Sequence, residues 1–556
     1  MWQPRVSRHW LAIAVTAGLL ALAGAPSWAI AIIKGPYLQH VTQTSIVVMW
    51  ETDTAATGTV DYGPTAGYGW SATDPSTATI HEVEITGLTS DSLYHYQATS
   101  GTATSSDSTF ETAPPPGVPF RFAAYGDTRT NPSDHQSVIN RMVTTTPRLV
   151  VHTGDIIADG NVYSQWQTQF FGPAASLIRN TPMALALGNH ENNSHWYYDF
   201  FSNPMDSGNE AWYTFRYGDA RFICVDSCQT YTSGSAQYNW LQSTLAAPTD
   251  AIWTFVYFHH PPYSSGGHGG SGTAQTHLVP LFEQYGVAIV FNGHDHIYER
   301  SFKDGVYYIV TGGGGAPLGS VNANPNPYQV YADSLLHHCV IDINGGTLTC
   351  RGVRASNGSE FDEFTIAKLI TATSPTLPAG WHLISLPFEP QNPDPAVVFA
   401  GVPIDEALFR YNTATKAYVM YQALDPGTFG PVSAGEGYWL NLTESHTISY
   451  EGYSTGSSQT VDLPQAGWWL IGAPRDTATG LDVLRMRDDT TGGTYSLIVA
   501  RMLGWINLPV YAYDAAAGGY LTVGFEPWRH SLELQPWSGC WMATNRDDLV
   551  LIVPAP

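Results

Sequence analysis

Basic residues and long apolar runs are both scarce in this sequence. Of its 556 residues only 23 are Lys or Arg, against 47 Asp or Glu, so the formal net charge is −24 at pH 7. A surface this acidic repels nucleic acid and anionic membranes, which argues against both as partners. No stretch is long enough to span a bilayer comfortably. The five cysteines permit disulfides but do not form a disulfide scaffold.

One apolar run stands out near the start of the chain. WLAIAVTAGLLALAGA (10–25) follows Arg5 and Arg8 and precedes Ser27-Trp28-Ala29, a small-x-small cleavage site. This arrangement is typical of a secretory signal peptide over residues 1–29. We therefore expect a secreted protein, extracellular or periplasmic, with no membrane span. Loss of the leader leaves 21 basic against 47 acidic residues, a net charge of −26.

The cysteines offer one pair that a hairpin could bring together. Cys339 and Cys350 flank VIDINGGTLT, in which a two-residue Asn344-Gly345 turn would set them opposite each other. They are the first candidate for a disulfide. Cys224 with Cys228 is a weaker candidate, and Cys540 is left over.

Three folded regions follow the leader. Residues 35–113 hold short alternating segments between Thr, Ser, Gly and Asp turns, the pattern of a β-sandwich, and the linker PPPG (114–117) ends them. Residues 118–372 alternate apolar strands with helix-like stretches at 133–146 and 236–247, which predicts a central α/β domain of β-sheet layers flanked by helices. Residues 378–556 are β-rich again.

The last region contains an internal repeat. AGWHLISLP (379–387) matches AGWWLIGAP (466–474), 408–421 matches 510–523, and 435–443 matches 538–546. We expect a duplicated all-β module. Its tryptophans could form a sugar-binding face, but aromatic residues at strand positions are more often core, and we favour the core: Trp381, Trp439, Trp468, Trp469 and Trp541.

Five apolar runs of the central region end in polar, metal-competent residues. The endings are YGD at 127, TGD at 155, LGNHE at 187–191, FHHPP at 258–262 and NGHDH at 292–296. Continuously apolar runs are typical of strands buried on both faces, and ligand sites lie beyond the carboxyl ends of such strands. The endings supply carboxylate, amide and imidazole ligands: Asp127, Asp155, Asn189, His259, His294 and His296.

This ordered set resembles the calcineurin-type metallophosphoesterases, and in particular the purple acid phosphatase branch. The motifs are GD (127), GD (155), GNHE (188–191), HxP with His259, and GHDHIYER (293–300). The likeness covers residues 35 to about 370, because the front region resembles a fibronectin type III domain, with Trp50 in its core and Leu88 six residues before Tyr94.

The resemblance implies two metal ions, of which Fe, Zn or Mn are the expected identities. Asp155 would bridge them, Asp127 and His296 would complete one site, and three residues would complete the other: Asn189, His259 and His294. A hydroxide activated by the metals would then attack the phosphorus of a phosphomonoester. His190 would protonate the leaving group or, alternatively, only hold Asn189 in place. His268 in PPYSSGGHGGSG resembles a histidine that reaches the substrate, and a mobile loop histidine is the alternative.

Two positions depart from the family pattern. The iron-binding tyrosine expected three residues after the bridging aspartate is Ala158, so we predict a colourless protein. The histidine that other metallophosphoesterases place two residues after the first aspartate is Arg129, which stays protonated and cannot ligate a metal. Arg129 would grip the phosphate or form a salt bridge. Water, Asn131 or Tyr163 would complete the first site.

The sequence leaves other functions open. The same site could hydrolyse diesters, as a phosphodiesterase or nucleotide pyrophosphatase. A non-catalytic surface or adhesion protein is a further alternative, although all six ligand types are present. With either activity, the C-terminal module could contact glycans or the cell envelope.

Overall fold

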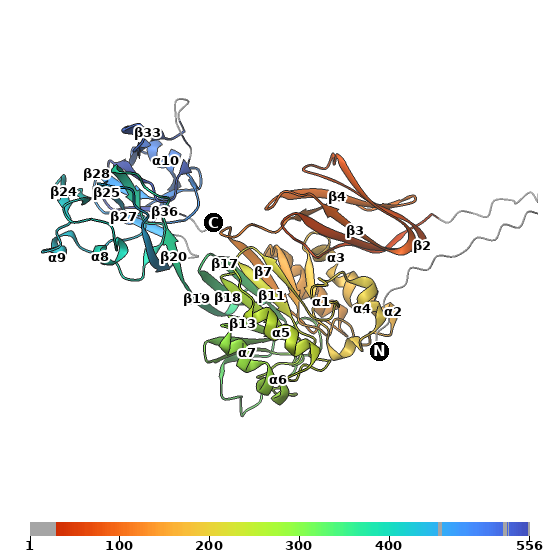
Figure 1. The fold of residues 1–556 in the computed structure, drawn as a ribbon. Helices are drawn as coiled ribbons and strands as arrows, with labels where there is room; N and C mark the ends of the chain where they lie inside the picture. The colour runs from red at the N-terminus through yellow and green to blue at the C-terminus, as the bar shows by residue number, and fades with distance from the viewer. Residues whose placement is uncertain (1–28, 454–458, 526–530, 532, 554–556) are drawn as a thin grey trace, which may run out of the picture.

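The computed structural model describes residues 29–453, 459–525, 531 and 533–553 (Figure 1). The predicted signal peptide therefore lies outside the described residues, apart from Ala29. Within the described ranges, none of the helices is both long and apolar enough to cross a membrane.

The front region is a β-structure built around one long strand. β2 pairs with β1 through its first half, with β4 through its second half, and with β3 through both. Its register with β3 shifts between Glu51 and Gly58, so the two halves of β2 belong to the two layers that enclose the core. Trp50 is fully buried in that core, and the hydroxyl of Tyr94 accepts a hydrogen bond from the backbone N–H of Thr89. Both features fit the expected fibronectin-like sandwich. The strands are β1 (Ile32–Gln39), β2 (Ser45–Gly63), β3 (Trp70–Thr86), β4 (Leu93–Ser100), β5 (Ala103–Thr104) and β6 (Ser108–Glu111).

Two sheets face each other in the central domain. The first has the order β19-β18-β17-β7-β8-β9, and the second β10-β11-β12-β13-β15-β14-β16. Phe122 of β7 packs edge-on against Phe222 of β11, with 5.0 Å between ring centroids, which places the main core between the sheets. The strands of the first sheet are β7 (Phe120–Tyr125), β8 (Leu149–His152), β9 (Met183–Leu185), β17 (His337–Asn344), β18 (Thr347–Arg354) and β19 (Glu360–Ala367). Those of the second are β10 (Tyr213–Tyr217), β11 (Ala220–Cys224), β12 (Trp253–Tyr257), β13 (Ile289–Asn292), β14 (Tyr298–Lys303), β15 (Val306–Thr311) and β16 (Gln329–Asp333).

Helices cover the outer face of each sheet, which buries the apolar strands on both sides. One group packs over β7, β8 and β9: α1 (Pro132–Thr144), α2 (Tyr163–Gln165), the π-helical turn η1 (Trp166–Phe171), α3 (Gly172–Ile178) and α4 (His195–Phe200). The other packs over β11, β12 and β13: α5 (Ala236–Ala246), α6 (Gly272–His277) and α7 (Val279–Gln284). The helix-like stretches at 133–146 and 236–247 are thus α1 and α5.

Two of the four-stranded sheets in the described part of the C-terminal region have the same topology. Their orders are β21-β25-β23-β24 and β28-β35-β32-β33, and each occupies one of the repeats found in the sequence. This match supports the duplication. The first half contains β20 (Leu369–Thr373), β21 (Gly380–Ser385), β22 (Glu389–Pro390), α8 (Pro395–Val398), β23 (Leu408–Asn412), β24 (Ala417–Met420), α9 (Pro426–Phe429), β25 (Gly437–Leu442) and β26 (Ser449–Tyr453). The second contains β27 (Gln459–Leu463), β28 (Gly467–Gly472), β29 (Thr479–Gly480), β30 (Arg485–Asp488), β31 (Thr494–Ser496), α10 (Leu497–Met502), β32 (Ile506–Asp514), β33 (Gly519–Val523), β34 (Glu533–Leu534), β35 (Gly539–Thr544) and β36 (Leu549–Val553).

Two expectations from the sequence are wrong in detail. β17 and β18 turn at Gly345-Gly346 rather than Asn344-Gly345, so Cys339 lies opposite Gly352 and not opposite Cys350. All five cysteines belong to the described residues and all are unpaired. The prediction that the tryptophans are core also fails for Trp381 and Trp468, whose side chains are 43% and 46% exposed.

Candidate metal centre

The polar strand endings meet at one edge of the two sheets. β7, β8 and β9 run parallel in the first sheet, and β12 and β13 run parallel in the second, so the carboxyl ends within each sheet point to one side. The contacts of His259 with Asp155 and Asn189 show that these two sides are adjacent. The loops that follow these strands carry all six predicted ligands. The structure thus brings the strand endings together, and metal binding by these residues stays a prediction.

Three potential ligand atoms surround the Nε2 atom of His259, which is itself the fourth. The Oδ1 atom of Asp155 lies 3.2 Å away, that of Asn189 3.1 Å and the Nδ1 atom of His294 3.2 Å. The opposite ring nitrogen of His259, Nδ1, donates to the carbonyl oxygen of Thr153 at 3.0 Å. The Nε2 atom is therefore the unprotonated one in the neutral ring, and it faces other lone pairs.

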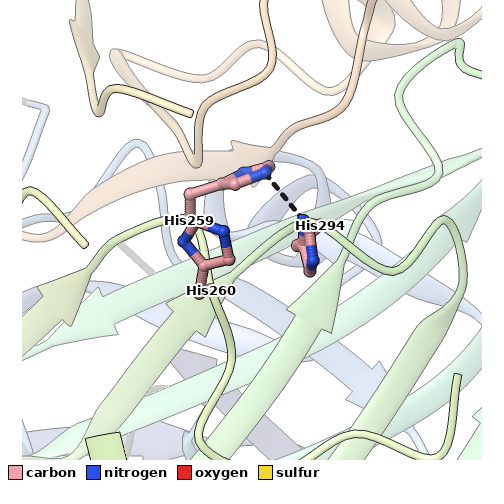
Figure 2. Close-up of side chains that lie close together, drawn as sticks. All are labelled: His259, His260 and His294. Carbon is pink, nitrogen blue, oxygen red and sulfur yellow. Dashed lines mark hydrogen bonds between the residues drawn. The ribbon is translucent and has the colours of Figure 1, made fainter. Parts of the chain in front are cut away.

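This donor set fits a divalent cation. Asp155 and His259 are buried, and their lone pairs repel each other unless a proton or a metal ion lies between them. Burial disfavours the charged His259, but the carboxylates of Asp155 and Asp127 outweigh it and raise the pKa of His259 to about 9. Burial and the neighbouring His259 lower the pKa of His294 to about 2, which leaves its ring free to act as a ligand. Figure 2 shows the two rings meeting, with His260 beside them.

The remaining predicted ligands surround a guanidinium group. The Oδ1 atom of Asp127 lies 3.6 Å from Nε2 of His296, and ligating atoms of Asp127, Asp155 and His259 lie within 4.8 Å of one another. Between these groups, Nε of Arg129 lies 3.3 Å from Oδ2 of Asp155, and its Nη2 lies 3.3 Å from Nε2 of His296. The positive charge of Arg129 thus occupies the space expected for the first cation, between Asp127, Asp155 and His296. A metal ion fits at this position, in addition to one at His259, only if the Arg129 side chain moves. Tyr163 is bound elsewhere, to Glu51 and Lys34.

Three of the predicted ligands have a strained backbone conformation. Asp127, Asp155 and His294 have φ values of 57°, 54° and 71°, a region that non-glycine residues seldom adopt. Glycines at two positions let the loops pass close to the carboxylates of the site. A Cβ at Gly188 would lie 2.2 Å from Oδ1 of Asp155, and one at Gly293 would lie 2.3 Å from Oδ2 of Asp127. Any larger residue would displace a carboxylate.

Two further predicted residues lie at the rim. His190 donates its Nδ1 proton to the carbonyl oxygen of Ala158 at 2.7 Å, and its Nε2 atom lies 3.8 Å from Oδ2 of Asp155. The ring of His268 stacks obliquely on His294, with 4.3 Å between centroids. Both histidines therefore belong to the same site as the ligands.

Sequence reasoning missed three residues that support this site. Glu191 is fully buried, and its carboxylate accepts hydrogen bonds from the backbone N–H groups of Asp155, Ile156 and Gly188. Burial raises the pKa of Glu191 to about 7. The position of Glu191 in the GNHE motif indicates that it belongs to the site. The sequence does not distinguish, however, a carboxylate that accepts hydrogen bonds from backbone N–H groups from one that ligates a metal ion.

Asp295 and His260 are the other two. Asp295 accepts hydrogen bonds from Ser264 and from the backbone N–H of His268, at 2.5 and 2.9 Å, and so anchors the glycine-rich loop. His260 lies 4.4 Å from the His294 ring, and its Nδ1 atom is bonded to Ser227. It forms a second close group of ligand atoms with His259 and His294.

Comparison with known proteins agrees with this site. Residues 120–298 match the family described as calcineurin-like phosphoesterase, and residues 35–112 match the purple acid phosphatase N-terminal domain. The chain is 29% identical to Purple acid phosphatase 13 of Arabidopsis thaliana over 300 residues, 43% of this chain and 54% of that protein. It is 24% identical over 263 residues to a nucleotide pyrophosphatase/phosphodiesterase of Hordeum vulgare, 39% of this chain and 71% of that one.

A solved structure shares the fold. Purple acid phosphatase PPD1 of yellow lupin (Lupinus luteus) aligns with a TM-score of 0.55 and 21% identity, over 60% of this chain and 74% of that chain. The chain spans about half the length of the first curated relatives that it matches, and some relatives are named as probable inactive purple acid phosphatases. The family binds two metal ions. Residues 35–112 and 120–298 are thus a purple acid phosphatase N-terminal domain and a calcineurin-like phosphoesterase domain, and the homologues of this chain are purple acid phosphatases.

Proposed function

We propose that this chain is an exported, metal-dependent phosphoesterase that hydrolyses phosphomonoesters. The observation that supports this most strongly is a set of four ligand atoms that follow four different strands: Nε2 of His259, with atoms of Asp155, Asn189 and His294 each within 3.2 Å of it. Mixed carboxylate, amide and imidazole donors suit Fe, Zn or Mn. A bound divalent cation would neutralise phosphate oxygens and lower the pKa of a water molecule beside the phosphorus.

The two-metal arrangement is part of this proposal. Asp155 would be shared by both positions, because its Oδ1 atom faces His259 while its Oδ2 atom faces Arg129. Asp127 and His296 would hold the first cation, and Asn189, His259 and His294 the second. Because Ala158 stands where the family has a tyrosine, this position supplies no phenolate to the first cation, and purified protein should lack a strong visible absorption band.

His190 is placed to deliver a proton to the leaving group. Because the carbonyl of Ala158 can only accept, the proton on Nδ1 of His190 is fixed there. A second proton, when present, must reside on Nε2, which faces the site beside Asp155. The side chain is 31% exposed, so it can exchange that proton with solvent after each turnover.

Positive charge and ring contacts would hold the phosphate. Arg129 presents a guanidinium whose fork matches phosphate oxygens, and His268 approaches from the glycine-rich loop. In a chain with a net charge of −24, such local positive charge is needed to attract an anionic substrate.

Hydrolysis of p-nitrophenyl phosphate, with and without chelation, tests the proposal. Asn189→Ala should abolish both activity and the metal bound at His259, whereas His195→Ala, at a side chain 67% exposed outside the site, should change neither. Full activity after exhaustive chelation, or in Asn189→Ala, would show that this site does not carry the reaction. A well-folded, metal-loaded protein with no activity on a broad ester panel would favour the non-catalytic alternative.

A second candidate activity is phosphodiester hydrolysis. The match to a barley protein named as a nucleotide pyrophosphatase/phosphodiesterase favours it. Comparing rates on p-nitrophenyl phosphate and bis(p-nitrophenyl) phosphate distinguishes the two, because the monoester should be preferred under the main proposal. Export, and contact of the C-terminal module with glycans or the cell envelope, stay predictions.

A further inference from the structure

Two aromatic pockets lie in the C-terminal module, away from the metal centre. Their volumes are about 340 and 330 Å³, at the lower end of the range of ~300–1,000 Å³ for small-molecule sites. We call them pocket A and pocket B. Pocket A is lined by Tyr411, Trp468, Tyr511, Tyr520 and Trp541. Pocket B is lined by Trp381, Phe409, Tyr418, Trp439 and Tyr513.

The pockets are equivalent, residue by residue, through the internal repeat. Trp468 in pocket A corresponds to Trp381 in pocket B, since both are the second residue of the matching strands β28 and β21. Trp541 and Trp439 both occupy the third position of β35 and β25. In the hairpins, Tyr511 corresponds to Phe409, and Tyr520 to Tyr418.

The fifth wall of each pocket comes from the other repeat. Tyr411 belongs to the first repeat but lines pocket A, and its counterpart Tyr513 belongs to the second repeat but lines pocket B. All five positions are therefore aromatic in both pockets, and each repeat contributes one ring to the pocket of the other repeat. Packing of that interface alone would need only the buried members.

Several of these rings are too exposed to serve as core. Trp381 and Trp468 are 43% and 46% exposed, and Tyr418 and Tyr520 are 50% and 52% exposed. Large aromatic side chains left in water lose the free energy that their burial would provide, and clustered exposed apolar surface is typical of a binding site. The retention of the same exposed rings in both repeats points to a ligand.

The walls stand at steep angles to one another. In pocket A, Trp468 and Trp541 make an interplanar angle of 86°, and Tyr411 and Trp541 one of 80°. In pocket B, Trp381 and Trp439 make an angle of 81°, and Trp439 and Tyr513 one of 68°. A ligand in either pocket would thus touch ring faces on several sides, as in an aromatic cage.

From this geometry we infer that each pocket binds a quaternary ammonium group. The described residues that line the pockets include no carboxylate, amide, lysine or arginine, so a ligand that depends on many hydrogen bonds, such as a sugar, finds few partners. A trimethylammonium group needs none, because its charge is attracted by the ring faces. The acidic chain, with 47 acidic and 23 basic residues, also favours a cation over an anion.

Two equivalent sites would give avidity for a ligand that is displayed in several copies. A surface or polymer carrying choline-type groups could occupy both pockets at once, which raises the apparent affinity without any new contact. This inference is independent of the phosphoesterase proposal, because it uses residues of the C-terminal module only.

Titration of the full-length protein with tetramethylammonium chloride, followed by tryptophan fluorescence and calorimetry, tests this inference. We expect two sites per chain, and choline should compete for both. The uncharged choline isostere 3,3-dimethyl-1-butanol should bind at least about tenfold more weakly, because it lacks the charge that the rings attract. Equal binding of the isostere, or no binding of tetramethylammonium, would overturn the inference, as would binding of oligosaccharides alone.

Variants of the exposed rings assign the sites. Trp468→Ala and Trp381→Ala should each leave one site, and the double variant none, with unchanged phosphoesterase activity. Tyr495→Ala removes a 40% exposed aromatic of the same module outside both pockets and should retain two sites. Wild-type binding in the double variant would refute the assignment.

Vesicle sedimentation then separates the sources of the ligand. Binding to phosphatidylcholine but not phosphatidylglycerol vesicles would identify a lipid headgroup. Binding of soluble choline without binding to vesicles would identify a free or polymer-borne group.

Discussion

The position of Arg129 leads to a quantitative prediction about metal binding. Its guanidinium lies 3.3 Å from both Asp155 and His296, where a first cation is expected. Two unit charges about 4 Å apart repel by about 4 kcal/mol at the effective dielectric of a protein site, and a divalent cation by about twice that. The Arg129 side chain is 18% exposed and can turn toward solvent, so we take the lower figure.

Removal of this charge should therefore strengthen the first site. About 4 kcal/mol corresponds to nearly a thousandfold in affinity. We expect wild-type protein to bind one Zn²⁺ or Mn²⁺ tightly and a second much more weakly, and Arg129→Ala to bind two with similar affinity. Arg129→Lys keeps the charge and should stay closer to the wild type.

Calorimetric titration of chelator-treated protein, with metal analysis after desalting, measures this difference. Arg216→Ala removes an arginine whose partner is the exposed Asp250, and it should leave the metal stoichiometry unchanged. If wild-type protein loads two ions with equal affinity, and Arg129→Ala does not alter the second constant, the guanidinium does not compete with a cation. Absence of any tight site in the wild type would instead contradict the proposed function.

Three further predictions concern the site and the fold. Glu191→Gln should speed the loss of the metal at His259 to a chelator. An amide nitrogen facing the N–H groups of Asp155 and Ile156 breaks at least one hydrogen bond, at a cost of about 1–3 kcal/mol. An unchanged rate of metal loss would refute a positioning role for Glu191. His190→Ala should lower kcat about 10²–10⁴-fold for alkyl phosphates and much less for p-nitrophenyl phosphate, whose leaving group needs no proton; equal losses would argue against proton transfer by His190. Burial lowers the pKa of His135 to about 4, below its unfolded value of about 6.5. The contribution of His135 to the free energy of unfolding is therefore complete above pH 6.5 and is lost as the pH falls toward 4, by about 3 kcal/mol in urea unfolding experiments. His135→Asn should make the free energy of unfolding less dependent on pH in this range, and an unchanged dependence would show that other groups cause it.

The sequence alone determined where the site residues occur along the chain. Apolar runs that stop at Gly-Asp or Gly-Asn-His are local patterns, and β7, β8, β9, β12 and β13 end as those patterns predict. Parallel strands align their carboxyl ends, so the proximity of Asp155 and Asn189, which follow neighbouring strands of one sheet, agrees with the sequence pattern. His259 reaches them from the second sheet, which no strand pattern specifies. Burial and strand period are properties of short segments, which is why they can be read from a sequence.

The tertiary structure decided features that depend on partners far away in the chain. The direction of Arg129 is set by Asp155 and by His296, 167 residues away, and no local pattern encodes that choice. The hairpin register at Gly345-Gly346 depends on which of two adjacent turns fits strands β17 and β18, a difference of one residue that keeps Cys339 from facing Cys350. Exposure of Trp381 and Trp468 depends on how two repeats pack together, because strand alternation predicts which side chains share a face but not whether another layer covers that face.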